Sequence, residues 1–250
     1  MKKLSFLIIL LAFLILLNGC DMLVIEEDTF EYRQLSDQYN DYVMNDVVNY
    51  EDFKDIMNDV THVSTTSVFM IETQVLDIFR RVVSENFGTG TLIYTDNNYH
   101  YVLTTFQMIN LQSRFVEYYV TDAYGNKLSA EIFAADSTLK LGILRIGHTD
   151  EDYALIDLPS YMPLSGELLV MISNNHPTQN IQKLGSYLYQ DEMSYIKVES
   201  TQNANGSPIF NLQLELVGIQ YLYGESYVLM IDYQTIYEFA SPILPIWRYQ

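Results

Sequence analysis

Nucleophilic catalysis needs a hydroxyl or thiol with a base beside it, and this chain of 250 residues has one cysteine and four histidines. Ser207, which follows an Asn-Gly pair and precedes proline, is one of the hydroxyls that could act as a nucleophile. A serine needs a base such as imidazole to take its proton, and the four histidines are His62, His100, His148 and His176. None belongs to an HExxH segment or another paired ligand motif. The sequence therefore predicts no metal site and no cofactor.

The only thiol is that of Cys20, which ends an N-terminal segment with the order of an export signal. Lys2 and Lys3 come first, an apolar run of about a dozen residues follows, and a Leu-Asn-Gly tripeptide precedes the cysteine. The run is shorter than the ~20 residues that span a bilayer, which favours a cleaved signal over a permanent membrane helix. No disulfide within the chain is possible, so the lone thiol predicts another use.

The tripeptide and its cysteine resemble the bacterial lipobox, in which the sulfur receives a diacylglyceryl group and the chain is cut just before it. The resemblance implies a signal peptide over residues 1–19, lipidation of Cys20 and a lipoprotein anchored at the extracytoplasmic face of the cell membrane. Two acyl chains hold a protein on a bilayer, whereas one gives only marginal binding. The alternative is a buried helix or an uncleaved anchor that ends in cysteine, and the uncleaved anchor would also be membrane-attached.

An acidic segment over residues 20–62 follows the lipidation site. Positions 21–60 hold twelve acidic residues against one Arg and one Lys, and apolar residues such as Phe53, Ile56 and Val60 recur at roughly helical spacing. We expect a short helical stalk that anionic lipid repels, holding the domain off the membrane. A calcium site at Glu26–Asp28 is the alternative, but the spacing lacks the alternation and glycine of a calcium loop. The mature chain would carry 11 basic and 32 acidic residues, a net charge of −21 that excludes nucleic acid as a partner.

From residue 63 onward, short β-rich runs are separated by turn residues about every ten positions, which is typical of an all-β sandwich or a pair of barrels. The mature chain, about 230 residues rich in aliphatic and aromatic types, is long enough for two lobes with their own cores. We expect the boundary between the lobes near residues 149–163. Segment 74–86, apolar around Arg80 and Arg81, fits a helix and a long hairpin equally well.

Three separated segments resemble the trypsin-like serine proteases, and their bacterial HtrA branch in particular. The first reads GTGTLI at 88–93 and YVLTTFQMI at 101–109, similar to the family's G-S-G-x-I/V and Y-V-L-T-N-x-H-V-I motifs. The second reads AEIFAAD at 130–136 and KLGILRI at 140–146, similar to A-x-V-x-x-x-D and D-L-A-V-L-K-I. The third reads NANGSPIFN at 203–211 and LVGI at 216–219, similar to G-N-S-G-G-P-L-x-N and V-x-G-I.

The resemblance implies two six-stranded antiparallel barrels over residues 63–250, with the catalytic triad replaced. Gln107 stands at the histidine position, and its amide cannot shuttle a proton near neutral pH. Lys140 stands at the aspartate position, where a cation would repel an imidazolium. Asn205 stands at the nucleophile position and has no ionisable hydroxyl or thiol. The oxyanion-like turn of Asn203, Asn205 and Gly206 would survive, since asparagine tolerates positive φ.

The function predicted from these features is a membrane-anchored lipoprotein with a catalytically inactive trypsin-like domain that binds an extended peptide or a surface protein. Capture of the peptide beside a barrel strand would replace turnover. One alternative is an active serine endopeptidase that uses Ser207 as a displaced nucleophile with one of the four histidines as base. Another is a purely structural envelope protein, for which neither binding nor turnover is expected.

Overall fold

The computed structural model describes residues 50–111, 113, 115–176, 179–200, 204–224 and 226–245. The signal, Cys20 and most of the acidic segment lie outside the described residues, as does Asn203 of the oxyanion-like turn. Glu51–Gln250 forms one compact unit, and the description below concerns that unit.

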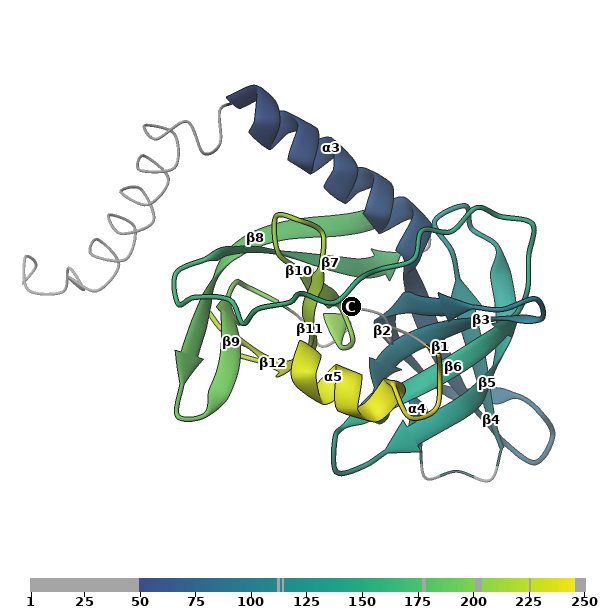
Figure 1. The fold of residues 1–250 in the computed structure, drawn as a ribbon. Coiled ribbons are helices and arrows are strands. Elements are labelled where there is room, and N and C mark those ends of the chain that lie inside the picture. The colour runs from purple at the N-terminus through teal and green to yellow at the C-terminus, as the bar shows by residue number, and fades with distance from the viewer. Residues whose placement is uncertain are drawn as a thin grey trace, which may run out of the picture. The chain divides into compact units, whose positions relative to one another are not determined.

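The first barrel is closed by six antiparallel strands in the order β1-β2-β3-β6-β5-β4 (Figure 1). Its strands are β1 (Val68–Leu76), β2 (Val82–Thr95), β3 (Tyr99–Thr105), β4 (Val116–Thr121), β5 (Lys127–Asp136) and β6 (Leu141–Gly147). Alternating residues of β1 such as Phe69 and Ile71 point inward, where they pack against Leu92, Val102 and Leu144. The period-two pattern thus builds the interior of this barrel.

The second barrel repeats the same topology, with strands in the order β7-β8-β9-β12-β11-β10. Its strands are β7 (Leu168–His176), β8 (Gln179–Gln190), β9 (Met193–Lys197), β10 (Pro208–Phe210), β11 (Leu216–Tyr223) and β12 (Val228–Asp232). Leu169, Met171, Tyr187 and Ile209 are among the residues that fill its interior. The two closed six-stranded antiparallel barrels confirm the predicted fold class and fit a trypsin-like fold.

A third and larger apolar cluster lies between the barrels and beneath two helices. It combines outward-facing residues of the first barrel, such as Leu103 and Ile143, with Val170 and Phe210 of the second. Helix α3 (Tyr50–Ser67) adds Val60, and helix α5 (Tyr233–Ala240) adds residues of its inner face. Strands β3 and β6 are therefore covered on both sides, which fixes the two barrels against each other.

Helix α3 leads without a loop into β1. Its apolar positions Ile56, Val60 and Val63 turn toward the shared cluster at helical spacing. Gln182 of β8 donates to the hydroxyls of Thr61 and Ser64, at 3.3 Å in each case. The helical spacing seen at the end of the acidic segment thus belongs to a helix that continues to Ser67 and packs on the barrels.

Candidate functional site at the junction of the barrels

The first side of the site is the one-turn helix α4 (Phe106–Ile109), which directly follows β3. Met108 and Ile109 are buried in the first barrel, so the turn presents Gln107 to the outside. The N–H of Phe106 donates to the carbonyl oxygen of Lys140 at 2.8 Å, which ties the turn to the residue before β6. Burial of its neighbours therefore positions Gln107.

The second side is the turn 204–207, which enters β10 of the second barrel. The N–H of Ser207 donates to the carbonyl oxygen of Ala204 at 2.9 Å, and Gly206 has a φ of +82° that favours glycine. Gly206 and Ser207 exchange backbone hydrogen bonds with Gln220 of β11, both at 2.9 Å. The turn is therefore held by its own barrel along its whole length.

The same turn is also bound to the first barrel through β2. The N–H of Thr89 donates to the carbonyl oxygen of Asn205 at 2.8 Å, and the hydroxyl of Thr104 donates to the carbonyl oxygen of Thr89 at 2.9 Å. A Cβ atom at Gly88 would lie 2.9 Å from the carbonyl oxygen of Asn205 and 2.5 Å from the sulfur of Met108. Glycine at this position lets the two barrels approach closely.

The two sides meet in a hydrogen bond between side chains. Nδ2 of Asn205 donates to Oε1 of Gln107 at 3.1 Å. The structure therefore brings together two of the predicted positions, those of the nucleophile and the base, and joins them as neutral amides. Neither amide titrates near neutral pH, so this pair can hold a geometry but cannot move a proton as a serine and histidine do.

Lys140 lies next to this pair through its backbone only. Its carbonyl oxygen bonds to the residue before Gln107, its φ is +63°, and its side chain is exposed. No hydrogen bond or ion pair of its ammonium group is found within the described part of the chain. Lys140 thus occupies the position that resembles the catalytic aspartate of trypsin-like proteases, and its ammonium group orients no described imidazole.

Ser207 is fully buried, and its Oγ has no hydrogen-bond partner among the described residues. A nucleophile must reach its substrate and must touch a base. The described geometry provides neither for this hydroxyl. The buried Oδ1 of Asn205 likewise has no partner in the described ranges.

The histidines whose side chains are described do not approach the turn. His62 is exposed on α3, His148 is exposed and stacks on His100, and nothing is described of the side chain of His176. His100 lies at the start of β3, five residues before its end, so roughly 17 Å of strand separates it from α4. None of the described imidazoles thus serves Ser207.

His100 lies near the start of β3 and is buried. Its Nε2 accepts from the N–H of Thr149 at 3.0 Å, and its Nδ1 pairs with the hydroxyl of Thr95 at 2.9 Å. Burial, and then the nearby charge of His148, lower the pKa of His100. It is held as a neutral structural imidazole because the chain after β6 covers it.

An edge of β11 that no described residue pairs with, called the free edge below, begins beside the turn. Strand β10 is short and pairs with β11 only as far as Ile219, while β12 pairs with β11 as far as Tyr223. Among the described residues, nothing pairs with the other edge of β11 beyond Gln220, and Leu222 and Tyr223 are exposed there. On the opposite edge, the pairing of β11 with β12 has a register shift between Gln220 and Leu222. An extended segment can add to the free edge.

Comparison with protein-family models and with curated proteins gives no match to this chain. The two closed barrels and the placement of the three motifs therefore carry the likeness to trypsin-like proteases. In the described residues, no three His, Cys, Asp or Glu side chains gather as metal ligands. No helix in that part of the chain is long and apolar enough to cross a membrane.

Sequence reasoning located Gln107, Lys140 and Asn205 but missed the groups that support them. Thr89 and Thr104 are fully buried and join β2, β3 and the turn. Thr89 also accepts from the N–H of Asn174 of β7 at 3.1 Å, a third link between the barrels. The available signal was the recurrence of threonine in the middle of β2 and at the end of β3, since a polar residue in a buried strand position needs a partner.

Proposed function

We propose that this protein is a catalytically inactive, trypsin-like lipoprotein that binds an extended peptide segment along the free edge of β11. The observation that carries the proposal is the position of that edge, which begins one residue after Gln220, the partner of the amide-bearing turn. Backbone groups of β11 offer hydrogen bonds to a bound strand, and Leu222 and Tyr223 offer apolar contacts. The bound segment would not be cleaved, because Asn205 and Gln107 supply neither nucleophile nor base.

The lipid anchor is the second part of the proposal. Cys20 follows the export signal, and acylation of its thiol would keep the binding domain at the extracytoplasmic face of the membrane. Replacing Cys20 with alanine is expected to release the protein from washed membranes, while the wild-type N-terminal fragment carries the mass of a diacylglyceryl group. An unmodified cysteine on a membrane-bound wild-type protein would contradict this part.

Peptide binding is best tested with two tyrosine variants that are alike in exposure. Tyr223 on the free edge is 47% exposed, and Tyr189 on β8 of the same barrel is 50% exposed. The probe is a pool of fluorescein-labelled, apolar-rich peptides of about eight residues, the length of an ordinary strand. We expect Tyr223→Ser to weaken binding about tenfold, the effect of losing a moderate interface tyrosine. Tyr189→Ser should leave the anisotropy titration unchanged.

Equal affinities for the two variants would remove β11 as the binding edge. Turnover is followed in parallel with an unfolded fluorogenic protein over hours, using wild type and Ser207→Ala. Hydrolysis by wild type that disappears in Ser207→Ala would replace the binding proposal with the endopeptidase alternative. Silence in both is the expected result.

A further inference from the structure

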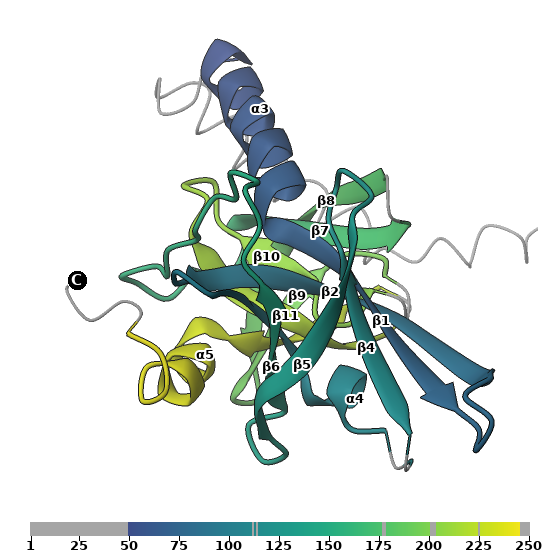
Figure 2. The same cartoon turned by 90° about the vertical axis from the view of Figure 1, so that its right-hand side faces the viewer.

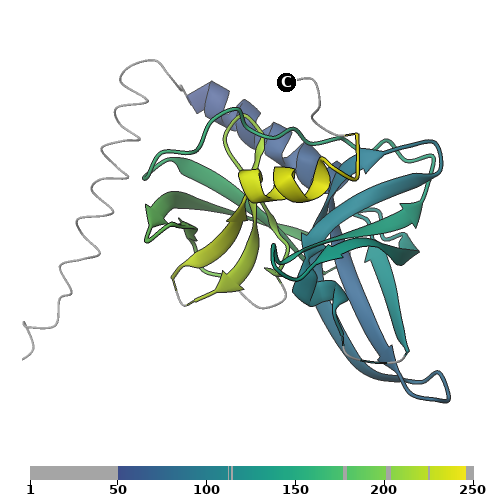
Figure 3. The same cartoon turned by 60° about the horizontal axis from the view of Figure 1, so that its bottom comes forward.

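The hairpin that joins β1 and β2 ends in an apolar tip, outside the site described above. Ile78 and Phe79 of its turn are 77% and 72% exposed, and Val82 and Val83 are also exposed. The segment left ambiguous by the sequence is therefore a hairpin, and Figures 2 and 3 show it projecting beyond the other strands of the first barrel. Apolar side chains that are exposed together in this way are typical of a surface that contacts a partner or a membrane.

Hydrogen bonds within the turn of residues 77–81 hold Ile78 and Phe79 in their exposed positions. Oδ1 of Asp77 accepts from the N–H groups of Phe79 and Arg81 at 2.8 and 2.9 Å. The backbone of Asp77 bonds to Arg80 and Arg81 at 3.0 and 2.9 Å, and Arg80 has a φ of +61°. These bonds fix the turn, so Ile78 and Phe79 cannot fold back onto the barrel without breaking them.

The charges of the tip distinguish it from the rest of the surface. Arg80 pairs with Glu117 at 3.3 Å and Arg81 pairs with Asp77 at 2.7 Å, so the tip has no net charge. The whole chain carries a net charge of −19, which an anionic bilayer repels. The tip has no net charge, so an anionic bilayer does not repel it. Long arginine side chains can reach lipid phosphates while their apolar neighbours enter the membrane interface.

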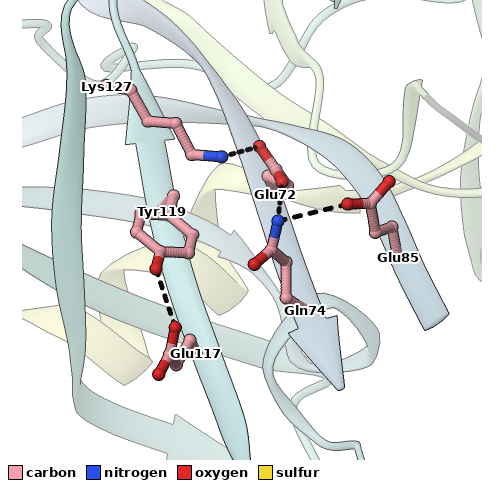
Figure 4. Close-up of polar contacts among 6 residues, drawn as sticks. All are labelled: Glu72, Gln74, Glu85, Glu117, Tyr119 and Lys127. Atoms are coloured by element: carbon pink, nitrogen blue, oxygen red, sulfur yellow. Dashed lines mark hydrogen bonds and ion pairs between the residues drawn. The ribbon is translucent and has the colours of Figure 1, made fainter. Parts of the chain in front are cut away.

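A polar band limits the apolar surface on the side toward the barrel. Figure 4 shows Glu72 paired with Lys127 at 2.6 Å, Gln74 bonded to Glu72 and to Glu85, and Tyr119 donating to Glu117. These residues lie on neighbouring strands β2, β1, β4 and β5 between the tip and the body of the barrel. Only the turn and the first residues of β2 can therefore enter an apolar phase.

We propose that this tip inserts into the interfacial layer of the same bilayer that anchors Cys20, giving the domain a second membrane contact. The inference rests on the lipid anchor of the proposed function. Helix α3 and strand β1 together measure no more than about 60 Å end to end. About 30 residues separate Cys20 from Tyr50 and can span up to ~100 Å. The tip can therefore reach the membrane when this segment is extended, and the proposal differs here from the helical stalk expected from the sequence, which would span about 45 Å.

The lone cysteine and the lone tryptophan of the chain allow a direct test. Residues 20–250 are coupled through the Cys20 thiol to a maleimide lipid in phosphatidylcholine–phosphatidylglycerol vesicles, which holds the domain at high local concentration. In a Trp247→Phe background, Phe79→Trp places the only indole at the tip. The control is Leu164→Trp, since Leu164 is 76% exposed in the chain between the barrels.

We expect a blue-shifted emission and quenching by brominated lipid for tryptophan at position 79, and neither effect at position 164. Equal, unshifted emission from both positions would overturn the proposal, provided that urea midpoints show both variants folded. A blue shift at position 79 that appears without vesicles and grows with protein concentration would also overturn it, assigning the tip to contact between copies. Chemical coupling replaces acylation, so the outcome is independent of whether cells lipidate Cys20.

Discussion

Replacing Gly206 with alanine tests how closely the turn of the site presses on the first barrel. The Cβ atom of an alanine there would collide with the carbonyl oxygen of Thr89 and lie 2.6 Å from the hydroxyl of Thr104. Gly125, in the turn before β5, provides the control because it has a similar φ, +88° against +82°, and no atom within 4 Å of its added Cβ. The two substitutions share the backbone strain and differ only in the collision.

The expected magnitudes follow from these two contributions. Left-handed backbone costs an alanine about 1–2 kcal/mol, and the loss of glycine entropy in the unfolded chain returns about 0.4–1 kcal/mol. Gly125→Ala should therefore lower the free energy of unfolding by about 0–1.6 kcal/mol. The collision at Gly206 is with backbone that is itself hydrogen-bonded to Asn205, and overpacking of such a site costs a further ~1–3 kcal/mol.

Urea unfolding of wild type and the two variants measures the difference, read from the midpoints at constant m-value. We expect the midpoint of Gly206→Ala to fall clearly below that of Gly125→Ala. Equal midpoints would refute the close approach of the turn to Thr89, and with it the described junction of the barrels. A lower m-value in one variant would mean that the barrels no longer unfold together, and the comparison would then be made barrel by barrel with local probes.

Three further predictions concern chemistry, pH and charge. Asn205→Ser should hydrolyse no unfolded substrate in a fluorogenic assay, because its hydroxyl would face an amide instead of a base. The lowered pKa of His100 means that the unfolded chain takes up its proton first, so stability should fall as the pH drops below about 6.5, by at most ~1.4 kcal/mol per pH unit. His100→Gln should flatten that slope in urea titrations between about pH 5 and 6.5. Lys127→Met should cost about 1–3 kcal/mol, since it leaves the buried carboxylate of Glu72 without its cation, whereas Arg145→Met should cost less than about 1 kcal/mol in the same assay.

The fold was predictable because most strands have one face in a barrel interior. Residues such as Phe69 and Ile71 alternate with residues of the outer face, and turn residues separate the strands at short intervals. The motif segments also fall on the elements that meet at the junction. Tyr101–Thr105 lies in β3, Leu141–Ile146 in β6 and Leu216–Ile219 in β11, so the sequence placed the strands that carry the site.

The contacts within the site were not predictable, because they depend on rotamers and on residues far apart in the chain. The Asn205–Gln107 bond joins positions 98 residues apart, and no local pattern specifies which way either amide points. The β1–β2 hairpin was ambiguous for a different reason. Its apolar residues Ile78, Phe79 and Val83 are exposed, so they follow neither the helical nor the alternating periodicity that burial imposes.

The amide pair can hold the junction of the barrels together without supplying a nucleophile or a base. An active triad keeps a reactive hydroxyl and a titratable base unencumbered, an arrangement that costs stability. Asn205 and Gln107 instead bond to each other, and a neutral bond of this kind contributes about 0.5–1.5 kcal/mol across the junction. The turn is meanwhile held by backbone bonds to Thr89 and Gln220 that do not depend on either side chain. In the proposed function, the β11 edge therefore stays in place whatever residues occupy positions 107 and 205, and a peptide can bind there without being cleaved.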